Sequence, residues 1–113
     1  MKKESNRFMF SEDIPREEIA PGVMRKIMGW TRNLMVIYVE FGKDTVFPPH
    51  NHPHDQITFV LEGEFEIEIE GEKRVLKKGD AYVVPGNAMH AVKCLREGVM
   101  MDTFSPMRED FLE

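Results

Sequence analysis

The sequence has almost no cysteine, no long apolar run and no basic cluster, and each absence excludes a class of protein. Cys94 is the only cysteine, so no disulfide can form within the chain and a reducing, intracellular setting is expected. The longest apolar stretch, from Leu34 to Val39, has the length of one strand and is too short to cross a bilayer. No apolar segment follows the basic first residues, so we expect no secretory signal and predict a cytoplasmic protein.

Positive charge is also scarce. The formal net charge is −5, and the lysines and arginines are scattered, apart from a group at residues 73–78 that is typical of an exposed hairpin end. Nucleic acids and anionic membranes are bound through basic surfaces, so neither is an expected partner. A small acidic ligand remains compatible with this charge, because one well-placed arginine can bind a carboxylate locally.

What the sequence does contain is an alternation of apolar and polar residues. It is clearest at residues 64–70, where Phe65, Ile67 and Ile69 alternate with four glutamates. This pattern is typical of an antiparallel strand with one buried and one solvated face. The predicted strands are Asn33–Phe41, Gln56–Leu61, Glu64–Glu70, Lys73–Leu76, Ala81–Val84, Met89–Leu95 and Val99–Phe104.

These short strands are separated by turns roughly every ten residues, which is typical of an all-β sandwich or barrel. A chain of 113 residues is long enough for one hydrophobic core but not for two. We therefore predict an N-terminal arm over residues 1–22 and a single β-barrel domain with a C-terminal tail over residues 23–113. The arm is polar and acidic, and at most one helical turn is expected in it, near residues 16–19.

Histidines provide the clearest functional signal. His50, His52, His54 and also Gln56 occupy alternate positions, so on an extended strand their side chains would project from one face. Imidazoles that converge inside a concave fold can bind zinc, nickel, iron or manganese, and nearby prolines stiffen the segment. Exposed loop histidines are the alternative, which is less favoured for three residues at this spacing than for one. The fourth histidine, His90, follows a Pro-Gly-Asn turn.

Two windows of the sequence resemble the two motifs of the cupin family. The first is matched by His50, His52, Gln56 and Gly63, and the second by Gly79, Pro85 and His90. The resemblance implies a double-stranded β-helix, the jelly-roll barrel of cupins. It also implies one divalent transition metal (zinc, nickel, manganese or iron), with the ligands His50, His52, Gln56 and His90.

Two departures from the motifs matter. Gln56 stands where many cupins have glutamate, which implies weaker metal binding, and whether Gln56 or His54 completes the ligand set stays open. Cys94 stands where the second motif ends in asparagine. We interpret it as a small buried apolar residue rather than a ligand or nucleophile.

The C-terminal segment from Asp102 to Phe111 resembles the tail of the pectin-degradation cupins of KdgF type, as do residues 25–29, 33–35 and 52–58. Similar proteins convert Δ4,5-unsaturated monouronates, from pectin or alginate breakdown, into linear 5-keto-4-deoxyuronates. The resemblance implies catalytic roles for Asp102, as a proton shuttle, and for Arg108, as a carboxylate clamp. Phe104 and His54 would then contact the substrate. The alternatives are a solvent-facing Asp102 and a surface ion pair at Arg108.

Two other functions remain open for a cupin of this kind. One is a metal-dependent dioxygenase, which oxygen consumption and metal content would distinguish. The other is a non-catalytic sugar-binding cupin, although the sequence has no helix-turn-helix and no basic face to serve a DNA-binding regulator. Because relatives are commonly dimers, we also expect a homodimer.

Overall fold

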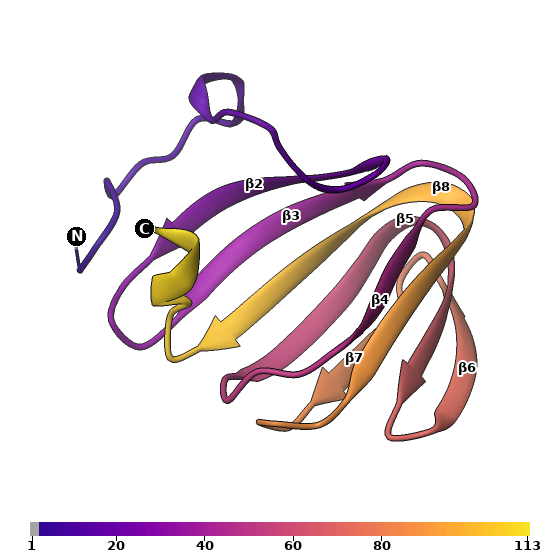
Figure 1. The fold of residues 1–113 in the computed structure, drawn as a ribbon. Coiled ribbons are helices and arrows are strands. Elements are labelled where there is room, and N and C mark those ends of the chain that lie inside the picture. Colours follow the sequence, from indigo (N-terminus) through magenta and orange to yellow (C-terminus); the bar gives the residue numbers. More distant parts are fainter. Residues whose placement is uncertain (1–2) are drawn as a thin grey trace.

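Residues 3–113 are described here in a computed structural model, in which strands dominate (Figure 1). Eight strands are formed by these residues, together with 3-10 turns at Ser11–Asp13 and Glu109–Phe111. The strands are β1 (Glu17–Ala20), β2 (Val23–Trp30), β3 (Met35–Phe41), β4 (Val46–His50), β5 (Asp55–Ile69), β6 (Glu72–Lys77), β7 (Ala81–Val84) and β8 (His90–Ser105). All pair antiparallel. The predicted all-β class is confirmed.

Two long strands, β5 and β8, hold the fold together. They pair along their whole length, from Asp55 opposite Ser105 to Ile69 opposite His90, and Figure 1 shows both bending midway. The first half of β5 and the second half of β8 lie in one layer with β7, β3, β2 and β1. The other halves lie in a second layer with β6 and β4. Each long strand thus belongs to both layers of the barrel.

The bend explains why the predicted strands were too short. The predicted strands ended at Leu61 and Leu95 and resumed at Glu64 and Val99, whereas β5 and β8 continue through both gaps, with register shifts between Val60 and Phe65. Gly63 has a φ of +92°, and a Cβ there would lie 2.6 Å from the Glu97 carbonyl oxygen. Only glycine allows the two backbones to approach this closely.

The N-terminal arm differs from expectation in one respect. The helical turn expected near residues 16–19 is wrong, since this segment forms β1 and pairs with β2. The short helical turn lies earlier, at Ser11–Asp13. Ile19 packs against the core, which accounts for the strand: pairing with β2 buries this side chain. The predicted boundary after residue 22 falls in the turn between β1 and β2.

Side chains from both layers fill the barrel interior at the end away from the histidines. Phe65 and Cys94 are fully buried there, and the Phe41 and Phe65 rings meet edge to face at 5.2 Å. The buried position of Cys94 agrees with its interpretation as a small apolar residue. No helix among residues 3–113 is long and apolar enough to cross a membrane.

Candidate metal centre and cavity

Three histidines meet at the open end of the barrel. His50 ends β4 and lies directly opposite His90, the first residue of β8. His52 follows in the loop after β4. One ring nitrogen from each of these residues lies within 4.8 Å of the others. Two distant stretches of sequence thus bring three imidazoles to one point, as the two-motif pattern predicted.

Backbone carbonyls hold each imidazole in one orientation. Each Nδ1 lies within hydrogen-bond distance of a carbonyl oxygen two residues away: His50 to Pro48 at 3.0 Å, His52 to His54 at 3.1 Å and His90 to Ala88 at 2.9 Å. A carbonyl can only accept, so the N–H must sit on Nδ1 and the Nε2 lone pair is left available.

The Nε2 lone pairs have an environment that suits a cation. His90 Nε2 is buried and has no hydrogen-bond partner among the described residues, a costly arrangement without a ligand. His52 Nε2 lies 3.0 Å from Gln56 Oε1. The Gln56 amide nitrogen donates to Thr58 at 2.8 Å, so the amide carbonyl must face His52. Two acceptors facing each other at this distance fit a shared metal ion.

The protonation of the cluster also favours metal binding. Burial lowers the pKa of His90 to about 4, against the hydrogen bond to Ala88 that raises it. Burial also lowers the pKa of His50 and of His52, and the Arg108 guanidinium lowers both further. All three rings are therefore neutral at pH 7, the form that binds a metal. The cluster is a candidate site for one metal ion.

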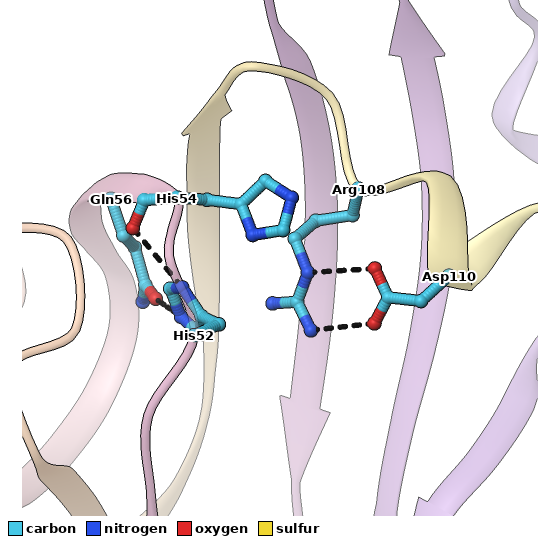
Figure 2. A network of polar contacts seen from close by, with 5 residues as sticks. All are labelled: His52, His54, Gln56, Arg108 and Asp110. Atoms are coloured by element: carbon cyan, nitrogen blue, oxygen red, sulfur yellow. Dashed lines mark hydrogen bonds and ion pairs between the residues drawn. The ribbon is translucent and has the colours of Figure 1, made fainter.

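His54 does not join the other histidines. The single extended strand expected over residues 50–56 does not form, because β4 ends at His50 and β5 begins only at Asp55. The chain bends at residues 53 and 54, so the alternation that would align the side chains is lost. His54 instead lines an outer groove with Arg108 and Asp110, and Figure 2 shows its ring on the Arg108 side.

A carboxyl group is linked to the cluster by hydrogen bonds. Thr58, fully buried, accepts from Gln56 and donates to Asp102 Oδ1 at 2.7 Å. Thr58 and Asp102 are register partners on β5 and β8. Burial raises the pKa of Asp102 to about 6, although Thr58 and Arg108 oppose the rise. A carboxyl group with this pKa can both hold and release a proton near neutral pH.

These groups surround a cavity of about 120 Å³. Six of the eight residues singled out from the sequence line it: His50, Gln56, His90, Asp102, Phe104 and Arg108. His52 and His54 line the outer groove beside it.

Arg108 is not an exposed surface residue. Its side chain is only 12% exposed and forms two hydrogen bonds to the Asp110 carboxylate, at 3.0 and 2.8 Å (Figure 2). Its guanidinium carbon also lies 5.0 Å from the centre of the Phe104 ring. Arg108 therefore reaches the cavity while it stays paired at the rim.

Sequence reasoning missed three residues of this site: Arg25, Thr58 and Phe111. Arg25 and Phe111 line the cavity, and Thr58 connects the Gln56 amide to the Asp102 carboxyl group. A signal was present for two of them. Arg25 lies two residues after Val23, and Thr58 lies two residues after Gln56, so the period of two places both side chains on an inward face of their strands. Phe111 lies in a 3-10 turn, where no such period applies.

The sequence profile of the cupin domain family matches residues 37–103, more than half of the chain. This chain belongs to the cupin family. The cupin is 50% identical over 108 residues to the pectin degradation protein KdgF of Dickeya dadantii (strain 3937), covering 94% of this chain and 98% of the relative. An uncharacterized protein of Aquifex aeolicus (strain VF5) is 42% identical over 60 residues, 51% of this chain and 50% of that one.

Solved structures agree with this assignment. KdgF from Halomonas sp. is 40% identical and superposes with a TM-score of 0.89, covering 95% of this cupin and 99% of that chain. An RmlC-like cupin from Shewanella frigidimarina NCIMB 400 is 37% identical with a TM-score of 0.93, covering 97% and 99%. The similarity to cupins of KdgF type seen in the sequence is thus confirmed along nearly the whole chain.

Proposed function

We propose that this cupin opens the ring of Δ4,5-unsaturated monouronates, released by pectin or alginate breakdown, to give linear 5-keto-4-deoxyuronates. One observation carries the proposal: His50 and His90 of the histidine cluster, a carboxyl group with a raised pKa and an arginine line a single small cavity. The 50% identity to a pectin degradation protein supports the choice of substrate. The cytoplasm remains the compartment in which we expect this reaction.

The substrate is a cyclic enol ether that carries a carboxylate. Ring opening needs a proton at C4 and water at C5, and the hemiketal formed there then breaks its bond to the ring oxygen. The water is returned when the hydrated aldehyde at C1 loses water, so the overall reaction is an isomerisation. Each step adds or removes a proton, or makes or breaks a carbon–oxygen bond with a proton transfer beside it, and acid–base groups in a partly buried cavity can assist such steps.

Asp102 is assigned the proton transfer to C4. Thr58 binds Oδ1 of this carboxyl group, so the transferable proton sits on Oδ2. The pKa of about 6 keeps a fraction of the group protonated at neutral pH, and the proton can be recovered from water after each turnover.

The remaining residues bind and orient the substrate. Arg108 pairs with the sugar carboxylate through its fork of N–H groups, Phe104 walls the cavity, and His54 contacts the substrate from the outer groove. His50, His52, His90 and Gln56 would hold a divalent transition metal, which supplies Lewis acidity toward substrate oxygens when bound. Metal analysis of the purified protein would identify the ion among zinc, nickel, manganese and iron.

The test uses unsaturated galacturonate made with a pectate lyase, and follows the loss of its ultraviolet absorbance. Metal-loaded protein should accelerate ring opening well beyond the spontaneous rate. Asp102→Asn and Arg108→Ala should each lower the rate by about 10²- to 10⁴-fold while fold and metal content persist. Glu66→Gln, which removes a carboxylate from the outer face of β5, serves as control. No acceleration by the loaded wild-type protein would refute the proposal.

A further inference from the structure

We propose that Arg25 is a second substrate-binding residue, which holds the carboxylate of the sugar together with Arg108. The inference deepens the proposed function and rests on it for the identity of the sugar. It applies to any small acidic sugar that enters the cavity, so a binding measurement can test it separately from turnover.

Strand β2 directs Arg25 toward the interior. Val23, two residues earlier, is fully buried, and Arg25 shares its face of the strand. Only 15% of the Arg25 side chain is exposed, and the residue lines the same cavity as Asp102 and Arg108. A mostly buried cation that faces a cavity is costly unless an anion meets it there.

The ion pair on the other side of Arg25 meets only part of this need. Glu17 Oε1 lies 3.3 Å from Arg25 Nε, and the Glu17 side chain is 46% exposed. Such a pair contributes little, and it engages one of the three guanidinium nitrogens. Both terminal nitrogens of Arg25 lack a hydrogen-bond partner among residues 3–113.

Arg108 offers less. Two of its five N–H groups, on Nε and on Nη2, are engaged by the Asp110 carboxylate, so the two N–H groups of Nη1 and the second of Nη2 remain for a ligand. A carboxylate has two oxygens and about four lone-pair directions. One oxygen can accept from Arg108 and the other from Arg25 without breaking the pair between Arg108 and Asp110.

Phe111 contacts both guanidinium groups. The guanidinium carbons of Arg25 and of Arg108 each lie 4.1 Å from the centre of its ring. Cation–π contacts at this distance fix both cations against one side chain. Two cations that line one cavity favour an anionic ligand over a neutral one of the same shape.

The experiment compares Arg25→Ala, Arg25→Lys and wild type, with KM and kcat for unsaturated galacturonate and with calorimetric binding of saturated galacturonate and neutral galactose. For Arg25→Ala we expect KM and the galacturonate Kd to rise about 10- to 100-fold, the usual effect of losing a charge-assisted hydrogen bond. The value of kcat should change less than about threefold, because Arg25 has no role in proton transfer. Arg25→Lys should recover part of the loss.

Arg16→Ala is the matched control. Arg16 also pairs with a glutamate, Glu40 at 2.8 Å, but its side chain is 54% exposed and it does not line the cavity. A KM and a galacturonate Kd for Arg25→Ala within twofold of wild type would overturn the inference. So would a wild-type protein that binds galacturonate no better than galactose. Absence of turnover with intact, Arg25-dependent binding of galacturonate would refute the ring-opening reaction and leave this inference standing.

Discussion

Thr58 contacts both halves of the proposed machinery through one hydroxyl group. It accepts from the Gln56 amide and donates to Asp102, so it orients the amide carbonyl and engages one carboxyl oxygen. We expect Thr58→Val, which keeps the shape and removes the hydroxyl, to weaken metal binding by about 10- to 100-fold. Metal titration of the apoprotein measures this, and Thr58→Ser should restore tight binding. Equal affinities for the valine and wild-type proteins would contradict the role.

Asp102 also makes stability depend on pH. The pKa of about 6 lies above the ordinary value of 3.8, so the folded protein binds this proton more tightly than the unfolded chain does. The resulting stability is fully present below about pH 4 and is lost as the pH rises through about 6. Asp102→Asn mimics the protonated form, so the variant should match wild type near pH 4.

Above about pH 7 the same variant should exceed wild type by about 3 kcal/mol in the free energy of unfolding, which corresponds to the rise in pKa from 3.8 to about 6, because its side chain has no charge to desolvate. Urea denaturation of both apoproteins across this pH range measures the difference. A constant difference at every pH would show that burial does not raise the pKa of Asp102.

At the scale of elements, the bend in β5 and β8 can be tested with two glycines of the same conformation. Gly63 and Gly79 have φ angles of +92° and +93°, but a Cβ at Gly63 meets backbone atoms whereas a Cβ at Gly79 meets nothing within 4 Å. Gly79→Ala should cost about 1–2 kcal/mol from its conformation alone. Gly63→Ala should cost about 3 kcal/mol or more, since the opposing strand must also move. Equal losses in denaturant melts would rule out close backbone approach as the reason for glycine.

Strand positions were predictable where alternation was strong, and their ends were not. Phe65 and Ile67 revealed the inner face of β5, because in this segment buried apolar residues alternate regularly with more exposed polar ones. The strand predictions stopped short of Gly63 and resumed after it, whereas this glycine lets one strand change layers. The sequence around residues 16–19 offers no period, and only pairing with β2 makes it a strand.

Some residues of the candidate site were likewise predictable from the sequence, and others were not. His50, His52 and His90 were found because imidazoles at motif spacing are rare by chance. The position of His54 depends on a bend between two strands, which a rule of alternation cannot foresee. Arg25 was overlooked because a single arginine in a strand is usually solvated. Only the structure reveals that this side chain lines the cavity.

For the whole molecule, metal binding and folding should be linked, because the proposed ligands come from both layers of the barrel. An ion present at one hundred times its Kd stabilises the folded state by about 2.7 kcal/mol, which corresponds to roughly 10 °C in Tm for a domain of this size. Removal of metal with a chelator should lower the Tm of the wild-type protein by this order. His90→Ala, whose cluster is incomplete, should show little response, and an equal response would place the metal elsewhere.

The expected homodimer remains a prediction. Outward positions on β5 change from apolar residues in its first half, Ile57 at 55% and Phe59 at 39% exposed, to glutamates in its second half. An apolar sheet face of this kind often marks contact with another protein. Light scattering coupled to size-exclusion chromatography should find twice the mass of one chain, and a monomer at micromolar concentration would refute the expectation.

Phe111 forms part of the cavity wall, and Glu113, two residues later, borders the outer groove beside His52 and His54. A segment attached after Glu113 would therefore begin beside this groove. A polyhistidine purification tag placed there would bring additional imidazoles near the histidine cluster, where they would compete for the metal ion. Metal stoichiometry should therefore be measured on protein from which such a tag has been cleaved.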